Sequence, residues 1–226
     1  MYKRDALPGG HVIMLGQGCE DAALAAIRAY PGGLHVGGGV NPSNALTYLD
    51  AGASHVVVTS YVFKDGAIDW DRLEELRTTV GKDRLVLDLS CRRQPGGSER
   101  GDFVVVTNKW QKFTSFAVNR ENLERLATYC DEFLVHGVDA EGKMCGVLED
   151  LVSLLVECSP LIVTYAGGAS SLQDLDLVRE LGRGRVDLTI GSALDIFGGK
   201  LEYNKVVQWQ RENEARARAS FTALKR

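Results

Sequence analysis

Short runs of aliphatic and β-branched residues recur along the chain, and amphipathic segments separate them. The run at 84–89 is apolar at four of its six positions, which is typical of a strand covered on both faces of a parallel sheet. The intervening segments have helical spacing, and several begin with capping residues such as Asn41-Pro42 and Ser170-Ser171. This alternation predicts a parallel α/β fold. We predict strands near 11–15, 34–38, 55–59, 84–89, 132–136, 161–166 and 186–190, and helices near 20–30, 42–51, 69–80, 119–130, 146–157, 170–181 and 203–217.

One insertion interrupts the alternation. The segment Gln94-Pro95-Gly96-Gly97-Ser98 is typical of a turn, and Phe103 to Thr107 has the composition of a further strand. We therefore predict a β-hairpin at about 94–107, placed on the rim of the fold.

An internal repeat favours a closed barrel over an open sheet. Gly38-Gly39 recur as Gly167-Gly168 at an offset of 129 residues, and Thr59-Ser60 correspond to Gly191-Ser192 at an offset of 132. The two copies are four strand–helix units apart, and eight such units close a TIM-type (β/α)8 barrel. Only seven strands are predicted, so residues 1–226 form a single barrel domain in which the first strand is missing. The alternative is a chance similarity between short glycine-rich turns.

Composition and charge exclude several functional classes. The 226 residues are 45% hydrophobic with a formal net charge of −4, which argues against a disordered chain and a dedicated nucleic-acid binder. The longest apolar runs have the length of strands, so no membrane association is predicted. The five cysteines have no CxxC pair and the four histidines no HExxH spacing, so neither a disulfide framework nor a protein-bound metal is expected.

Glycine and hydroxyl residues follow four of the predicted strands. A barrel binds its ligands at the carboxyl ends of its strands, and we call this end of the barrel the mouth. Glycines allow backbone N–H groups to approach an anion, and a following helix N-terminus adds a favourable field. We predict two phosphate-binding cups and therefore a substrate with two phosphates. Glycines that only make turns are the alternative. The first cup consists of Gly38, Gly39, Thr59 and Ser60, and the second of Gly167, Gly168, Gly191 and Ser192.

Candidate acid–base groups cluster near the same strand ends. Asp88 interrupts an apolar strand close to its end, where a carboxylate is costly unless it faces polar partners or the mouth. The segment after the next strand supplies His136 and Glu141, and a structural or solvated carboxylate is the alternative for each acidic residue. The hairpin contributes Arg92 and Trp110, whose indole either stacks on a planar heterocycle or anchors the hairpin to the barrel. We expect Cys91 and Cys145 to be packing residues.

These segments together resemble the HisA family of histidine biosynthesis, in particular its eukaryotic, plant-type branch. The most specific stretches are HVIMLG, LHVGGGVN, VVTSYVF, LVLDLSCRR, NKWQKF, EFLVHGVDAEG, VTYAGGAS and TIGSALDIFGG. The resemblance implies an isomerase without cofactor or metal. Its reaction is the Amadori rearrangement of a bisphosphorylated aminoimidazole carboxamide ribotide from aldose to ketose.

The resemblance also implies roles for individual residues. Asp88 would be the general acid, and Glu141 could share that role. The usual base ends a first strand that would lie upstream of Met1. Two positions depart from the common family pattern, in which threonine stands at the His136 position and aspartate at the Glu141 position.

Two other functions remain open at this point. One is a HisF-like cyclase, which shares the barrel and the substrate skeleton, although SCRRQPGG and NKWQKF look isomerase-like. The other is a non-catalytic barrel that binds a phosphate ligand. In each case we expect a monomer with a small-molecule ligand, located in the cytoplasm or a plastid.

Overall fold

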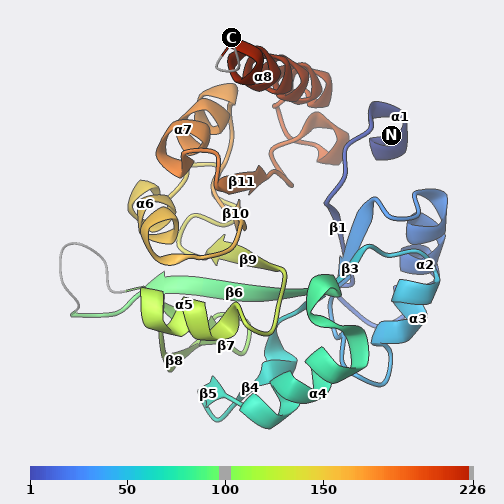
Figure 1. Ribbon diagram of the computed structural model, residues 1–226, viewed down its shortest axis with the longest axis vertical. Coiled ribbons are helices and arrows are strands. Elements are labelled where there is room, and N and C mark those ends of the chain that lie inside the picture. Colours follow the sequence, from blue (N-terminus) through green and yellow to red (C-terminus); the bar gives the residue numbers. More distant parts are fainter. Residues whose placement is uncertain (97–102, 224–226) are drawn as a thin grey trace.

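The computed structural model describes residues 1–96 and 103–223, with side chains up to Arg216. Its centre is a curved sheet with helices on the outside (Figure 1). Within the described residues, seven parallel strands follow the order β1-β2-β3-β6-β9-β10-β11. They are β1 (Gly10–Ile13), β2 (Leu34–Gly37), β3 (His55–Val58), β6 (Leu85–Arg93), β9 (Glu132–Gly137), β10 (Val163–Ala166) and β11 (Val186–Thr189). All seven strands predicted from the sequence are confirmed.

Helices follow the strands and cover the outer face of the sheet. They are α2 (Glu20–Ala29), α3 (Ala45–Asp50), α4 (Trp70–Val80), α5 (Arg120–Leu126), α6 (Glu149–Cys158), α7 (Leu172–Gly182) and α8 (Tyr203–Ala223). Short 3₁₀ turns occur at η1 (Ser60–Val62), η2 (Lys82–Arg84) and η3 (Asp195–Phe197), and a small ribbon of β4 (Phe63–Lys64) and β5 (Ala67–Ile68) precedes α4. This is the TIM-type α/β architecture that the repeat predicted.

Two predicted helices begin later than expected. The segment 42–44 is a turn in which the Asn44 side chain accepts a hydrogen bond from the Asn41 N–H, so α3 starts at Ala45. Before α6, the Leu148 N–H donates to the Tyr165 hydroxyl and holds the chain in an extended conformation. In both places, side-chain hydrogen bonds compete with the first helical turn.

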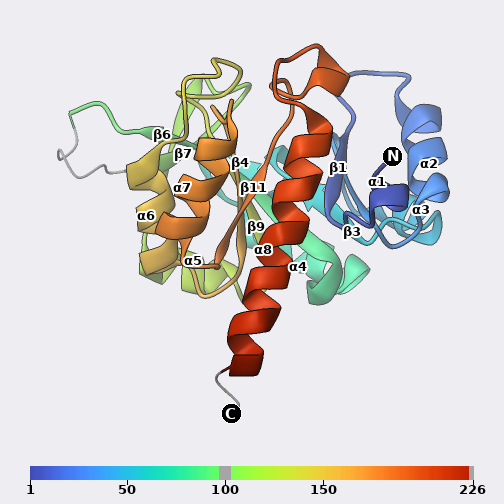
Figure 2. The ribbon, with the colours of Figure 1, turned by 90° about the horizontal axis from the view of Figure 1, so that it is seen from above.

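The two ends of the strand order, β1 and β11, do not pair with each other in the described residues. The short helix α1 (Tyr2–Asp5) contacts α8 on this side of the molecule. The Tyr203 hydroxyl donates to the Asp5 carboxylate over 2.9 Å, and the Tyr2 and Tyr203 rings meet edge to face. Helix α8 lies between α7 and β1 and extends past the other elements at its carboxyl end (Figure 2).

The rim insertion is a three-stranded extension rather than the predicted hairpin. Strand β6 continues to Arg93 and pairs antiparallel with β7 (Phe103–Thr107), which pairs with β8 (Lys112–Ala117). Strand β8 was not predicted, because half of its six side chains are exposed and one of its two buried positions is the polar Thr114. Part of the predicted turn at 94–98, Gly97 and Ser98, lies outside the described residues.

The inward face of the sheet is divided into layers. Val57, Val86, Leu134 and Ala166 form one small buried cluster, separate from the larger core beneath the helices. Toward the amino ends of the strands, His11, His35 and His55 lie side by side on β1, β2 and β3. Their ring centroids are 5.6 Å and 4.5 Å apart. Alternation along each strand then points the residues at the carboxyl ends into the mouth.

Candidate active site

Asp88 and His136 face each other at the mouth. Strands β6 and β9 are neighbours in the sheet, and their register pairs Asp88 with Leu134 and Ser90 with His136. His136 Nδ1 lies 2.8 Å from Asp88 Oδ1. The Thr59 hydroxyl, directly after β3, donates to Asp88 Oδ2 over 2.9 Å. Three adjacent strands thus contribute to one hydrogen-bonded group.

The charge of Asp88 determines the electrostatics of this group. Burial by itself would lower the pKa of His136, but the hydrogen bond and negative charge of Asp88, together with the charge of Glu141, outweigh burial and raise it. The side chains of Asp88 and His136 are 13% and 24% exposed, so solvent screens their interaction only in part. The pair therefore favours the protonated form of the His136 imidazole.

A cavity of about 140 Å³ opens beside His136. Its wall consists of the residues that follow β9, β10 and β11, together with His136 itself. Besides His136 the lining comprises Glu141, Gly142, Met144, Ala166, Gly167, Gly168, Ala169, Thr189, Ile190, Gly191, Ser192 and Ala193. The cavity thus brings together two of the predicted catalytic residues and the whole predicted second cup.

The backbone of the second cup is suited to an anion. Gly167 and Gly168 have φ values of 122° and 80°, which an L side chain rarely adopts. A Cβ at Gly168 would lie 2.0 Å from the carbonyl oxygen of Gly146, so the loop approaches too closely for any other residue. Within the described part of the chain, the N–H groups of Gly168, Gly191 and Ser192 donate to no protein group. These N–H groups remain available to a phosphate.

The first cup repeats this geometry. Gly38 and Gly39 have φ values of 92° and 75°, and a Cβ at Gly38 would lie 2.1 Å from the carbonyl oxygen of Met14. Among the described residues, the N–H groups of Gly38, Gly39 and Ser60 also lack protein acceptors. Thr59 differs from the prediction in one respect, because its hydroxyl binds Asp88. That contact could not be predicted from the residues around Thr59, because it depends on the pairing of β3 with β6.

The rim extension contributes Trp110 and Arg92. The Trp110 indole N–H donates to Ser90 Oγ over 3.1 Å, while the ring remains 40% exposed. Both roles considered for this residue are thus compatible with its position, since it anchors the extension and presents a ring face to solvent. Arg92 is engaged by the Asp139 carboxylate at 2.8 Å, and its guanidinium lies over the Phe113 ring.

The two cysteines near the mouth differ from each other. Cys91 is fully buried, and burial raises the pKa of its thiol, as expected for a packing residue. Cys145 is exposed, so its assignment to packing was wrong. It lies in the loop between β9 and α6, which does not pack against the core at this point.

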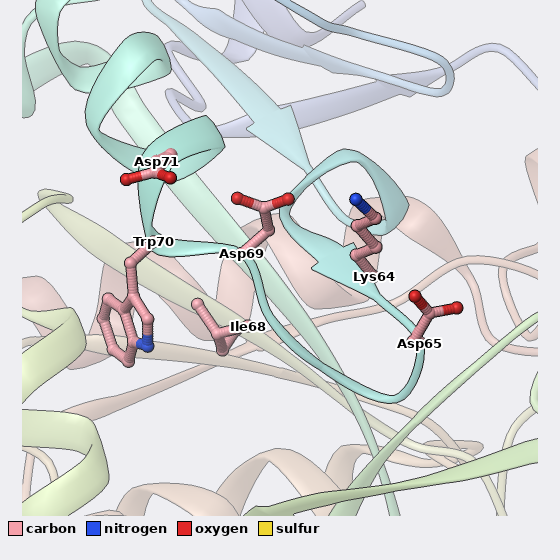
Figure 3. A pocket seen from close by; sticks show the side chains of 6 residues that line it. All are labelled: Lys64, Asp65, Ile68, Asp69, Trp70 and Asp71. Carbon is pink, nitrogen blue, oxygen red and sulfur yellow. The ribbon is translucent and has the colours of Figure 1, made fainter.

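A second, larger cavity of about 410 Å³ lies outside the barrel at the β4–β5 ribbon and the start of α4 (Figure 3). Its lining residues include Asp65, Asp69 and Asp71 around a single cation, Lys64. Three carboxylates repel a phosphate ester, so this cavity does not suit the predicted substrate.

Among the described residues, no three His, Cys, Asp or Glu side chains are grouped so that they could hold a metal ion. No described helix is long and apolar enough to cross a membrane.

Comparison with known proteins gives consistent results. Residues 11–202 match the family described as histidine biosynthesis protein. A protein of Medicago truncatula is 53% identical over 216 residues, which is 95% of this chain and 68% of the relative. It is named 1-(5-phosphoribosyl)-5-((5-phosphoribosylamino)methylideneamino) imidazole-4-carboxamide isomerase, with the addition "chloroplastic".

Fungal proteins with the same isomerase name are also similar. The Yarrowia lipolytica protein is 47% identical over 92% of this chain and 81% of its own length. The Saccharomyces cerevisiae protein is 45% identical over 92% of this chain and 80% of its own length. On these matches, the chain belongs to the histidine biosynthesis protein family and, within it, to the HisA-type isomerases.

Proposed function

We propose that this chain catalyses the aldose-to-ketose isomerisation named for its relatives, on a carboxamide ribotide that carries two phosphoribosyl groups. The carrying observation is the Asp88–His136 pair beside a cavity whose glycine-lined wall exposes free backbone N–H groups. The pair can move a proton, and the wall can hold a phosphate. Named relatives at 45–53% identity support the same reaction.

The reaction requires an acid and a base. In the aldose, an amino nitrogen is bonded to C1′ of a closed ribose ring. An acid protonates the ring oxygen, the C1′–O bond breaks, and the nitrogen lone pair forms an iminium at C1′. A base then removes the C2′ proton to give an enolamine, which tautomerises to the open-chain ketose. The positive charge that develops next to C1′ is best placed in a mouth that holds a carboxylate.

The two cups would bind the two phosphates. The first cup (Gly38, Gly39, Thr59, Ser60) lies at the ends of β2 and β3, and the second (Gly167, Gly168, Gly191, Ser192) at the ends of β10 and β11. Between them lie β6 and β9, which carry Asp88 and His136. A substrate anchored at both ends would thus place its ribosylamine over the acid–base pair. Both cups belong to one chain, so a monomeric barrel domain suffices.

The remaining roles follow from position. Asp88 and His136 supply the acid, with Glu141 on the cavity wall adding negative charge beside them. Trp110 offers an exposed ring to the imidazole heterocycle, and Arg92 sits at the same rim. The segments after β1, β2 and β3 (14–19, 38–44 and 59–62) contain no carboxylate. The base that the family resemblance implies, an aspartate ending a first strand, is therefore not replaced by any residue there.

The direct test is an isomerase assay on the purified protein. Conversion of the aldose to the ketose can be followed by NMR, through loss of the C1′ anomeric proton signal and appearance of a C2′ carbonyl. We expect turnover without added cofactor. Binding of the aldose without conversion would support a non-catalytic barrel. Conversion of the ketose to a ring-closed product in the presence of ammonia would support a cyclase.

A further inference from the structure

We propose that Tyr165 is a positioning residue for the second cup. Its hydroxyl holds the loop between β9 and α6, residues 138–148, against the Gly167-Gly168 turn, and the cup binds phosphate at full affinity only while this loop is held. The proposal rests on the proposed function, because it takes the second cup as a phosphate site. It adds a residue that is not part of the cavity lining.

The side chain of Tyr165 is fully buried on β10, three residues before Gly168. Its ring belongs to the core beneath the helices, and the Leu148 N–H donates to its hydroxyl over 3.0 Å. Burial raises the pKa of Tyr165 to about 12. The hydroxyl therefore stays neutral and remains an acceptor for this N–H near neutral pH.

The end of β9 leaves room for the tyrosine hydroxyl. A Cβ at Gly137 would lie 2.5 Å from the Tyr165 hydroxyl oxygen and 3.1 Å from a methyl carbon of Leu148. The hydroxyl thus occupies the space that a side chain at Gly137 would fill, between the last residue of β9 and the residue before α6. This close packing fixes the hydroxyl relative to both ends of the loop.

Two hydrogen bonds tie the loop to β10 and the cup. The Gly146 N–H donates to the Gly168 carbonyl over 3.0 Å, and Leu148, two residues later, is bonded to Tyr165. Together with the chain between their ends, these bonds close a ring that contains the glycine turn of the cup. Among the described residues, the segment 142–148 makes no other hydrogen bond to a residue outside the loop and α6.

The position of the loop determines the shape of the cup. A Cβ at Gly168 would lie 2.0 Å from the Gly146 carbonyl oxygen, so the two backbones are in direct contact. Residues 142–145 are exposed, and little packing holds the middle of the loop. Without the Tyr165 acceptor the Leu148 N–H is unpaired, and the loop gains freedom to leave the cup. A cup that is formed for only part of the time binds with an affinity reduced by that fraction.

The test is Tyr165→Phe, which keeps the ring and removes the hydroxyl oxygen. A ¹H–¹⁵N NMR titration with inorganic phosphate, at a temperature well below Tm, follows the Gly168 and Gly191 amides for the second cup. The Gly38 and Gly39 amides follow the first cup as an internal control. We expect the Kd at the second cup to rise by about 5–50-fold and the Kd at the first cup to change by less than about twofold.

Ser159→Ala is a matched control. The Leu161 N–H donates to the Ser159 hydroxyl over 3.2 Å, so this variant also removes a buried hydroxyl that accepts from a backbone N–H. Ser159 lies between α6 and β10, at the opposite end of β10 from the cup. The variant should lower Tm, as Tyr165→Phe does, and leave both phosphate affinities unchanged. A comparable loss of second-cup affinity in Ser159→Ala would show that affinity follows global stability, and it would overturn the proposal.

Amide hydrogen exchange measures the hold on the loop without phosphate or turnover. In Tyr165→Phe the Leu148 and Gly146 amides should both exchange faster, because one local opening releases both. Faster exchange at Leu148 with unchanged exchange at Gly146 would show that the hydroxyl does not keep the loop on the cup. That result would overturn the proposal, and so would an unchanged second-cup affinity in the folded variant.

Turnover separates the proposal from the isomerase function. A wild type that binds phosphate in the second cup, with weaker binding in Tyr165→Phe, but does not convert the aldose would reject only the isomerase function. In an active enzyme Tyr165→Phe should raise KM and change kcat by less than about threefold, since it acts on binding. A fall in kcat at unchanged KM would overturn the proposal. No phosphate-induced shift at Gly168 and Gly191 in the wild type would overturn it together with the second cup.

Discussion

The indole N–H of Trp110 donates to Ser90 Oγ over 3.1 Å, and Ser90 lies two positions after Asp88 on the same face of β6. This bond fastens the turn between β7 and β8 to β6, the strand that carries the carboxylate. A substrate ring stacked on Trp110 would therefore be held at a fixed distance from Asp88 and His136. The anchoring role and the stacking role of the indole can be separated by substitution.

Trp110→Phe removes the indole N–H and keeps an aromatic face. We expect it to cost about 1 kcal/mol of unfolding free energy, the usual value of one hydrogen bond, with a small change in KM. Trp110→Leu loses the ring as well and should raise KM by roughly 5–10-fold, since an aromatic contact is worth about 1 kcal/mol. Urea unfolding and steady-state kinetics measure the two effects. Equal KM values for both variants would show that the ring does not touch substrate.

Gly168 and Gly191 both belong to the second cup but tolerate a methyl group differently. Gly168 has a φ of 80° and no space for a Cβ, so Gly168→Ala should lower stability by more than about 3 kcal/mol. A Cβ at Gly191 meets no atom within 4 Å, and its φ lies outside the left-handed region. Gly191→Ala should keep the wild-type Tm and weaken the binding of inorganic phosphate, because the methyl group enters the cup.

Isothermal titration with inorganic phosphate and thermal unfolding of the two variants separate stability from binding. Unchanged phosphate affinity in a folded Gly191→Ala protein would contradict the assignment of the second cup.

The Arg92–Asp139 ion pair is half exposed, with side chains that are 38% and 36% accessible, so water and salt screen it. Asp139→Asn should therefore change the unfolding free energy by less than about 1 kcal/mol. It also frees the Arg92 guanidinium, which we expect to lower KM for the bisphosphorylated substrate at low ionic strength. Arg92→Met should raise KM instead. A loss of several kcal/mol in Asp139→Asn would show that the pair is structural.

The order of elements and the glycine turns after β2 and β10 could be predicted from the sequence because they depend on local signals. A buried strand such as 84–89 needs apolar residues at most positions, and close approaches such as that of Gly38 to Met14 need glycine. The contacts within the site depend instead on strand register. Nothing near Thr59 in the sequence indicates that its hydroxyl binds Asp88, because that contact arises only when β3 and β6 are adjacent.

The extent of the rim and the environment of Cys145 also escaped prediction. Strand β8 is held by pairing with β7 and by bonds such as that from the Thr114 hydroxyl to the Val105 carbonyl, and one of its two buried positions is the polar Thr114 itself. A cysteine in a loop carries no periodic signal that would tell packing from exposure. Both features depend on tertiary contacts rather than on local preference.

The row of histidines inside the barrel predicts how stability depends on pH. His35 is 6% exposed, and His11 Nε2, His35 Nδ1 and His55 Nδ1 have no hydrogen-bond partner among the described residues. Burial lowers the pKa of His11 to about 4 and that of His35 to about 3. In the unfolded chain each of these rings takes up a proton near the ordinary histidine pKa of about 6.5. In the native protein the two rings stay neutral at that pH.

Stability is therefore lost as pH falls, because below about 6.5 the unfolded state binds more protons than the native state. Each of the two rings should remove up to about 1.4 kcal/mol of unfolding free energy per pH unit between about pH 6.5 and pH 4. Burial raises the pKa values of Glu132 and Asp187, and these carboxylates act in the opposite direction, as sites that protonate more readily in the native state. A comparison of variants removes their contribution.

Chemical unfolding of the wild type and of His11→Gln/His35→Gln between pH 7 and 4.5 isolates the histidine effect. The difference in unfolding free energy between the two proteins should change steadily in favour of the variant as pH falls, since glutamine binds no proton in either state. Parallel curves would mean that the two rings accept protons in the native barrel. The unpartnered nitrogens of His11 and His35 would then need hydrogen-bond acceptors once protonated. Water would have to enter the amino-terminal layer of the sheet to supply them.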